Sequence, residues 1–376
     1  MPTKKNEISN GVKLMYFVNV RLPHTWAHSI QIMKMCEAFA RNGLEVELAT
    51  GMKRDTEEKI FAYYNIKTRF KITKIPHINL SSTSTSKINF LIRSFSFLFC
   101  AKLYALFKKY DILYLRTSLA GLFFNNFYLE VHELPPRIKS WHKLTYKKAK
   151  KIIVLTKFLK QELVASGVDE AKIITAADAV DLAEFAINLT RDEARRKLSL
   201  PANQKIIAYA GNFSFHDWKG VEIMLESLKY LPGVVCLLVG GEPSEKIEIK
   251  RRYPAENIII TGFKIHGEVP VYLKAADVLV LPNKRGNQNS AYYTSPLKLF
   301  EYMASQRPIV ASDLPAIREV LNEANAVLVK PDDPKALAEG VKRVLADDRL
   351  ADRLARQALA DVHNYTWQKR AEKIIN

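Results

Sequence analysis

Short apolar runs alternate with helical patterns from the start of the chain. The run Lys13–Val20 is apolar and partly β-branched, which predicts a buried parallel strand. Between His28 and Arg41 apolar residues recur at helical spacing, and Gly43 stands where a helix C-cap glycine is expected. The period-two run 44–48 predicts a second strand. Strand, helix and strand in this order predict a βαβ unit, with a parallel sheet and helices on its faces.

The same alternation continues in two series, which a polar stretch separates. In the first series we expect a helix at 157–165 and strands at 111–115, 127–131 and 151–155. The pattern stops near Asp178, and the charged stretch 188–204 is expected to be a linker with a lead-in helix. The second series predicts strands at 206–211, 234–240, 257–261, 278–281, 308–312 and 326–329. Two Rossmann-like halves are therefore expected, as a length of 376 residues also favours.

The positions of the cysteines and histidines argue against disulfide bonds and a metal site. The three cysteines, Cys36, Cys100 and Cys236, each lie in an apolar run, which suits buried thiols in a reducing compartment. The eight histidines form no HExxH motif and no Cys-x-x-Cys occurs, so no metal site is expected. No apolar segment follows the polar N-terminus before the first strand, so we expect no signal peptide and a cytoplasmic location.

The net charge of +18 is uneven along the chain. Residues 1–188 hold 29 Lys and Arg against 16 Asp and Glu. This excess indicates an anionic partner such as a phospholipid surface, a lipid-phosphate acceptor or nucleic acid, or else a solvated basic surface. The aromatic segment 88–107 contains Arg93 and Lys102, which make a membrane span costly. It is expected to be a buried or partly buried helix, or a surface helix that touches a membrane.

The segment 294–304 offers groups that could hold a nucleotide. Ser295 is a good helix N-cap and Pro296 is favoured at the first helical position, so a helix is expected to start here. Its amino end would face the ends of the strands, where open α/β sheets bind ligands. Lys298 and Glu301 share a face, with an ammonium for a phosphate and a carboxylate for a ribose diol. Alternatively, the two form a surface ion pair.

A second stretch, 209–220, contains Gly211 after a predicted strand and Lys219–Gly220 before a predicted helix. It brings a second lysine toward the same sheet edge. Two lysines and a helix N-terminus at one place predict a diphosphate site that needs no divalent ion.

The order of these and further motifs resembles family 4 of the glycosyltransferases from residue 12 to residue 375. The matching pieces are Ala27–Ser29, Glu130–Glu133, Asp178–Asp181, Lys219–Gly220, Gly240–Gly241, Thr261–Phe263, Ala276–Pro282 and Ser295–Pro308.

The resemblance implies an α/β fold of the GT-B kind, in which two Rossmann-like domains face each other across a cleft and a C-terminal helix crosses back. The expected divisions are a flexible N-terminus at 1–11, an acceptor domain at 12–188, a nucleotide-sugar domain at 189–363 and the crossover helix at 364–376.

The resemblance also implies a set of donor-binding residues. Glu301 matches the second of two family glutamates and is the expected ribose ligand, whereas Tyr293 stands in the place of the first. Asn212 follows Gly211 where the family tends to have arginine, so Lys219 and Lys298 are expected to hold the diphosphate. Backbone N–H groups of the segment that contains Thr294, Ser295 and Leu297 are expected at the donor sugar, and Phe263 and Lys264 beside the base.

On the acceptor side, His132 matches a family histidine that faces the cleft and would orient the acceptor or the transferred sugar. A histidine between strand and loop is also often purely structural. Glu133, His28 and Ala27 are further candidates for the same cleft. The catalytic residues are expected to be His132, Lys219 and Lys298.

The implied activity is transfer of a sugar from a nucleotide-diphosphate sugar to a hydroxyl of a glycan or lipid-linked acceptor, with retention and without metal. Synthesis of a bacterial surface glycan or glycolipid, with contact to an anionic membrane, would fit it. A sugar-nucleotide epimerase of the same fold and a catalytically silent sugar-binding scaffold are alternatives. Nucleic-acid binding is not expected, because no recognised motif for it is present.

Overall fold

The computed structural model describes residues 11–78, 87–213 and 218–376, which form two compact units. The first unit is Met1–Ala176 together with Trp367–Asn376, and the second is Ala177–Thr366. Residues 177–188, which the sequence analysis assigned to the first domain, pack with the second unit instead. The reason is that Val180 and Phe185 are buried in the core of that unit, and the Val180 N–H donates to the Tyr365 carbonyl at 3.0 Å.

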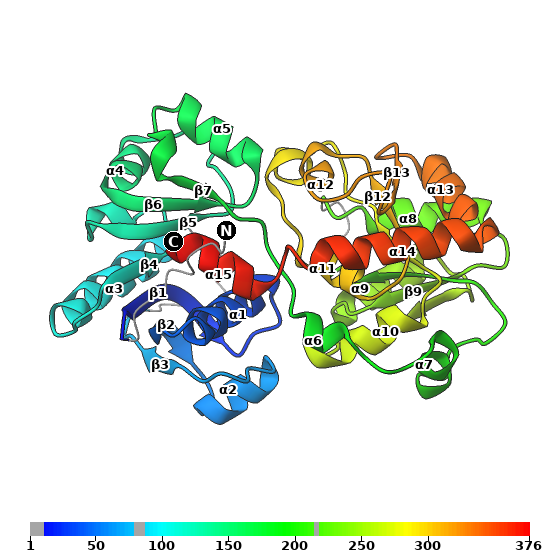
Figure 1. Cartoon of the computed structure of the whole chain (residues 1–376), viewed down its shortest axis with the longest axis horizontal. Coiled ribbons are helices and arrows are strands. Elements are labelled where there is room, and N and C mark those ends of the chain that lie inside the picture. The colour runs from blue at the N-terminus through cyan, green and yellow to red at the C-terminus, as the bar shows by residue number, and fades with distance from the viewer. Residues whose placement is uncertain (1–10, 79–86, 214–217) are drawn as a thin grey trace, which may run out of the picture. The chain divides into compact units, whose positions relative to one another are not determined.

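The first unit is built on a parallel sheet of seven strands in the order β3-β2-β1-β4-β5-β6-β7. The strands are β1 Lys13–Leu22, β2 Glu45–Lys53, β3 Lys71–Lys74, β4 Ile112–Leu115, β5 Phe127–Val131, β6 Ala149–Val154 and β7 Ile173–Thr175. The helices are α1 Ala27–Arg41, α2 Glu57–Tyr63, α3 Lys87–Leu106, α4 Ser140–Lys148, α5 Lys157–Ala165 and α15 Trp367–Ile375. Figure 1 shows α15, in red, beside α1 of the same unit.

The second unit has a parallel sheet of six strands in the order β10-β9-β8-β11-β12-β13. The strands are β8 Ile206–Ala210, β9 Val235–Val239, β10 Ile258–Ile260, β11 Val278–Leu281, β12 Ile309–Ser312 and β13 Val327–Val329. The helices are α6 Leu182–Phe185, α7 Arg191–Lys197, α8 Val221–Ser227, α9 Pro243–Arg252, α10 Val269–Ala275, α11 Leu297–Ala304, α12 Pro315–Arg318, α13 Pro334–Ala346 and α14 Asp348–Val362.

Burial explains why these segments form these elements. Ile32, Cys36 and Phe39 on α1 are all 0% exposed, as their helical spacing predicted. In β8, Ile206 and Ala208 pack into one core cluster and Ile207 and Tyr209 into another, because successive strand residues point to opposite faces. A strand buried on both faces reads as a continuous apolar run, which is the pattern observed.

The α/β class, the two parallel sheets and all the strands expected from the sequence are confirmed, with ends that differ by a few residues. The short edge strands β3 and β7 were missed, because runs of three or four residues carry little periodicity. One described helical segment, Ile88–Leu106 in α3, is long and apolar enough to cross a membrane when judged by length and composition.

Candidate functional site

The carboxyl ends of β8 and β11 form the switch point of the second sheet. The chain leaves β8 toward β9 on one side, while β11 continues toward β12 on the other side. Open α/β sheets bind ligands in the crevice at this point. Gly211 directly follows β8, and Pro282 and Asn283 directly follow β11, so these residues mark the candidate site.

Lys298, in the first turn of α11, reaches the end of β8. Its ammonium contacts the Tyr209 hydroxyl and lies 3.7 Å from the centre of the Tyr209 ring. A Cβ added to Gly211 would come within 2.9 Å of the Lys298 Nζ, and Gly211 has a φ of 136°. Glycine therefore permits both the backbone conformation and the approach of the lysine. The structure thus brings together Lys298 and Gly211, which are both among the predicted donor-binding residues, whereas Tyr209 was not foreseen.

The start of α11 differs from the expectation. The helix begins at Leu297 with Pro296 as its N-cap residue, and the Ser295 hydroxyl accepts a hydrogen bond from the Asp178 N–H at 2.8 Å. Ser295 is therefore not the cap, because a distant backbone donor takes its side chain. The Thr294 N–H donates to the Asn289 carbonyl at 2.8 Å, and proline has no N–H. The backbone donors expected at 294–297 are reduced to those of Ser295 and Leu297.

Lys219 and Gly220 lie at the end of β11, the strand beside β8. Gly220 has a φ of 67°, and a Cβ there would meet the Pro282 carbonyl oxygen at 1.9 Å. The Trp218 carbonyl accepts a hydrogen bond from the Lys284 N–H at 2.8 Å, which ties this segment to the residues after β11. Lys219 thus lies at the same edge of the sheet as Lys298. Its Nζ is 5.9 Å from the centre of the Trp218 ring. Residues 214–217 of the predicted loop lie outside the described residues.

Three further polar residues belong to the segments that follow β8 and β11 in the chain. The Asn212 carbonyl accepts a hydrogen bond from the Tyr209 hydroxyl at 3.3 Å, and its side chain is exposed. Tyr293 is buried, and its hydroxyl accepts a hydrogen bond from Gln288 at 2.7 Å. The Asn283 amide nitrogen is buried and has no hydrogen-bond partner among the described residues. Sequence reasoning did not find Asn283, although a polar residue directly after a buried strand was a usable signal.

Glu301 is held by a histidine that the sequence analysis also missed. His266 Nε2 lies 2.8 Å from one oxygen of Glu301, and its Nδ1 lies 3.3 Å from Glu184. The three side chains are only 14%, 11% and 5% exposed respectively. Burial opposes the charge of His266, but hydrogen bonds that His266 donates to Glu184 and Glu301, together with their negative charges, outweigh it and raise the pKa of His266 to about 10.

The consequence is a carboxylate with a fixed orientation one turn after Lys298. Because His266 is charged at neutral pH, it balances Glu301 and Glu184 inside the unit. A carboxylate has two oxygens and can accept further hydrogen bonds when one of them is taken. His266 is therefore a positioning residue for Glu301.

Phe263 and Lys264 follow the glycine turn after β10. Phe263 is 46% exposed, and the Lys264 Nζ lies 5.6 Å from the centre of the Tyr272 ring. The Thr261 hydroxyl accepts a hydrogen bond from the Gly240 N–H at 3.1 Å, so this segment is joined to the residues after β9. Phe263 thus offers an exposed ring at the edge of the sheet.

In the first unit, His132 belongs to a buried ionic network centred on Glu130. One Glu130 oxygen accepts hydrogen bonds from Arg370 at 2.7 Å and from Gln31 at 2.6 Å, and lies 2.9 Å from His132 Nε2; the other accepts one from Tyr114 at 2.8 Å. Burial opposes the charge of Glu130, but mainly Arg370 and His132 hold the pKa of its carboxyl well below the usual range.

The pKa of His132 is lowered to about 4, because burial and the charge of Arg116 outweigh the hydrogen bond to Glu130 and its negative charge, which raise it. His132 is therefore neutral at neutral pH. Since an ionised carboxylate only accepts hydrogen bonds, the proton of neutral His132 is on Nε2, which leaves Nδ1 as a proton acceptor. His132 can therefore hold Glu130 through Nε2 and still accept a proton or a hydrogen bond at Nδ1.

The other candidates of the first unit lie near the amino end of α1. Ala27 is its first residue, and His28 follows with its ring 5.2 Å from that of Trp26. The pKa of His28 is lowered to about 4, mainly by burial and by the charge of Arg116. Glu133 is exposed, one residue beyond His132.

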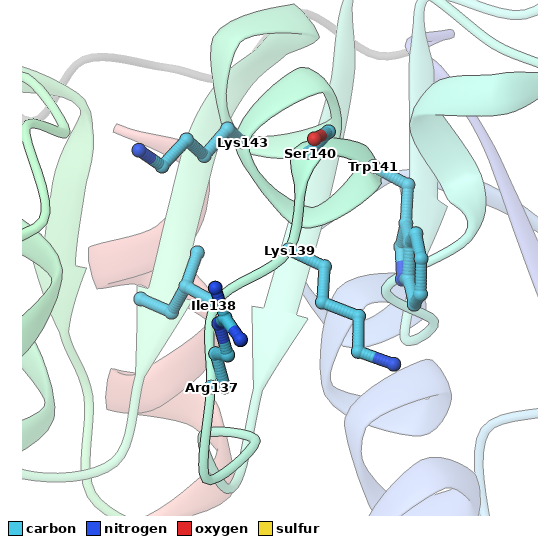
Figure 2. Close-up of a pocket in the computed structure, with 6 residues that line it drawn as sticks. All are labelled: Arg137, Ile138, Lys139, Ser140, Trp141 and Lys143. Atoms are coloured by element: carbon cyan, nitrogen blue, oxygen red, sulfur yellow. The ribbon is translucent and has the colours of Figure 1, made fainter.

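A basic pocket of about 430 Å³ lies at the start of α4 (Figure 2). It is lined by Arg137, Ile138, Lys139, Ser140, Trp141 and Lys143. Three of these side chains are cationic and none is acidic, and the Lys139 Nζ lies 4.7 Å from the centre of the Trp141 ring. Such a lining suits an anionic group next to an apolar one. This segment is not among the site residues predicted from the sequence.

Comparison with protein families supports the expected resemblance. Residues 204–347 match the model of the family described as "Glycosyl transferases group 1". The phosphatidyl-myo-inositol mannosyltransferase of Mycobacterium tuberculosis is 27% identical over 223 residues, which are 57% of this chain and 55% of the relative. The chain matches little more than half the length of the curated relatives that come first, namely 58%, 52% and 55%.

Solved structures resemble nearly the whole chain in fold. Sucrose-phosphate synthase from Thermosynechococcus elongatus has a TM-score of 0.77 at 20% identity and covers 96% of each chain. The Anabaena protein HepE, solved in complex with UDP-glucose, has a TM-score of 0.72 at 15% identity and covers 96% of this chain and 98% of its own. The likeness to group 1 glycosyltransferases and the GT-B class of the fold are thereby confirmed.

Proposed function

We propose that this chain, whose residues 204–347 match the group 1 glycosyltransferases, transfers a glycosyl group from a nucleotide-diphosphate sugar to a hydroxyl acceptor. The observation that carries the proposal is the position of the Lys298 ammonium at Gly211, with the carboxylate of Glu301 on the next turn of α11. An ammonium followed by a carboxylate on the next turn suits a diphosphate joined to a ribose diol.

The donor would lie along the ends of β8 and β11. Lys298 and Lys219 would bind the diphosphate, and the N–H groups of Ser295 and Leu297 would add donors at the amino end of α11. Glu301, positioned by His266, would accept hydrogen bonds from the ribose. Phe263 and Lys264 would lie beside the base, and Tyr293, Thr294 and Asn212 would face the sugar and the phosphates.

We propose that the reaction needs no metal ion and retains the configuration of the anomeric carbon. Breaking the bond between the anomeric carbon and the phosphate oxygen leaves negative charge on the nucleoside diphosphate, and fixed cations stabilise that charge. The acceptor oxygen would form its bond on the face that the phosphate leaves, and the hydroxyl proton would pass to the departing phosphate oxygen. Lys298 and Lys219 would thus act on the leaving group.

The first unit would bind the acceptor. Its basic pocket (Figure 2) suits a phosphate-bearing acceptor, such as a lipid-linked or growing surface glycan. His132, neutral and with Nδ1 as an acceptor, could orient a hydroxyl. The mannosyltransferase relative is named for a phosphatidyl-inositol acceptor, which supports a glycolipid or glycan product. We also propose a cytoplasmic location, in keeping with three free cysteines.

Release of nucleoside diphosphate from a panel of nucleotide sugars tests the proposal. We expect one donor to be consumed, with no effect of EDTA, and Lys298→Ala to lower kcat/KM by about 100-fold or more. Lys250→Ala, which removes an exposed lysine of the same unit, is the matched control. If Lys298→Ala turned the donor over at the normal rate, the assignment of the diphosphate site would be wrong. If the donor bound but no turnover occurred under any condition, a silent sugar-binding protein would be favoured, as the departures Tyr293 and Asn212 allow.

A further inference from the structure

The outward face of α3 is apolar along its whole length. Ile88, Leu91, Phe95, Phe99, Leu103 and Leu106 are exposed by 67%, 45%, 42%, 57%, 44% and 65%. Steps of three and four residues place them on one side of the helix, and we call them the α3 outer face. Phe90 and Phe107 are also exposed, by 56% and 85%. A contiguous exposed apolar patch of this kind marks an interaction surface.

The opposite side of α3 is firmly seated in the first unit. Phe97, Leu98, Ala101 and Ala105 are at most 6% exposed. The Tyr104 hydroxyl donates a hydrogen bond to Glu47 at 2.6 Å. A membrane-spanning position would break all these contacts and would place Arg93 and Lys102 in the bilayer core. The helix therefore offers one apolar side and keeps its place in the fold.

The charges around the α3 outer face are positive. The helix and the residues directly after it, 87–110, contain five Lys and Arg residues and no Asp or Glu. Arg93 lies 6.0 Å from the centre of the Phe90 ring, Lys102 lies 5.5 Å from that of Phe124, and Lys109 is exposed beyond the end of the helix. A second copy of the chain on this face would bring like charges together. An anionic surface would complement them.

We propose that the α3 outer face docks on a lipid bilayer that carries anionic headgroups, with the helix axis in the plane of the membrane. Its phenylalanine, leucine and isoleucine side chains would enter the boundary between headgroups and acyl chains, and the flanking lysines and arginines would contact the phosphates. The proposal is independent of the donor site, which lies in the other unit. It would hold the acceptor-binding unit at the surface where a lipid-linked acceptor resides.

Flotation of the full chain with vesicles tests the proposal. Vesicles of phosphatidylcholine with added phosphatidylglycerol should bind the protein at least tenfold more strongly than phosphatidylcholine alone, and added salt should weaken the binding. The double variant Phe95→Ser, Phe99→Ser should bind at least tenfold less. Ile247→Ser, which changes a side chain of the second unit that is 68% exposed, is the matched control and should bind like the wild type. Both variants should keep the melting temperature and the donor affinity of the wild type.

Insertion is separated from simple charge attraction by a fluorescence measurement. Brominated lipid should quench the emission of a Phe99→Trp variant more than that of the wild type. The proposal would be overturned by equal quenching, by binding that ignores the Phe95 and Phe99 substitutions, or by a wild type that dimerises through this face without lipid. Resistance of the membrane-bound chain to alkaline carbonate would also overturn it, because that outcome indicates a spanning helix.

Discussion

Replacing His266 with glutamine tests the interior of the donor-binding unit. The side chain lies 2.8 Å from Glu301 and 3.3 Å from Glu184. Glutamine can still donate a hydrogen bond to one of them, but it carries no charge. Two carboxylates would then lie in the protein interior without the cation between them, and removing one partner of a buried ionic pair typically costs ~3–5 kcal/mol.

The raised pKa of His266 gives a second value for the stability that the substitution removes. The pKa of His266 is raised from 6.5 to about 10 by the hydrogen bonds and charges of the two glutamates, against the effect of burial. A raised pKa stabilises the folded state fully below pH 6.5, and the stabilisation is lost as the pH rises through 10. Near pH 7.5 this linkage amounts to about 3 kcal/mol. In a unit of this size, such a loss lowers the melting temperature by roughly 6–12 °C.

The assay is calorimetric unfolding of the wild type and His266→Gln over a pH series. His363→Gln, an exposed histidine of the same unit, is the control and should shift the transition by less than about 2 °C. We expect a large difference between wild type and His266→Gln at neutral pH and a shrinking one above pH 9. A variant as stable as the wild type at pH 7.5, or a difference that does not change with pH, would refute a charged His266 between the two glutamates.

Three further substitutions test other parts of the structure. Gly220→Ala should lower the free energy of unfolding by at least ~2 kcal/mol, because its Cβ would meet the Pro282 carbonyl at 1.9 Å, whereas Gly286→Ala, with open space around it, should change little in the same denaturation. Arg370→Met should cost ~3–5 kcal/mol because it leaves the buried Glu130 without its main cation; Lys373→Met on the same helix is the control, and equal losses would contradict the role of the network. Tyr293→Phe should weaken calorimetric binding of the nucleotide sugar and leave that of the free nucleoside diphosphate unchanged; equal losses for both ligands would argue against a contact between Tyr293 and the sugar.

The features that sequence predicted are local ones. The strand β8 and helix α1 follow from apolar spacing within a few residues. Gly211 follows from its place after a strand, and Lys298 from its place at the start of a predicted helix. The features that it missed depend on residues far apart in the chain. His266 meets Glu301 35 positions away, and Arg370 meets Glu130 240 positions away. Ser295 was wrongly expected to cap α11, because no local pattern shows that the Asp178 N–H takes its hydroxyl.

The exposed surface of α3 could be predicted only in part from the sequence. The aromatic residues and cations of 88–107 indicated either a buried or a membrane-touching helix, and periodicity alone could not separate the two. The structure shows α3 with one side buried and Phe95 and Phe99 exposed on the other. Which face of an apolar helix is covered depends on the tertiary fold, so exposure was the information that the sequence lacked.

Calorimetric titration of the purified chain with UDP-, GDP-, ADP- and CMP-linked sugars, each with and without EDTA, tests the central proposal most directly. We predict that one nucleotide-diphosphate sugar binds with EDTA present and that Lys298→Ala removes this binding. If none of these donors bound the wild type at any concentration tried, the assignment of Lys298, Lys219 and Glu301 to a donor site would be contradicted.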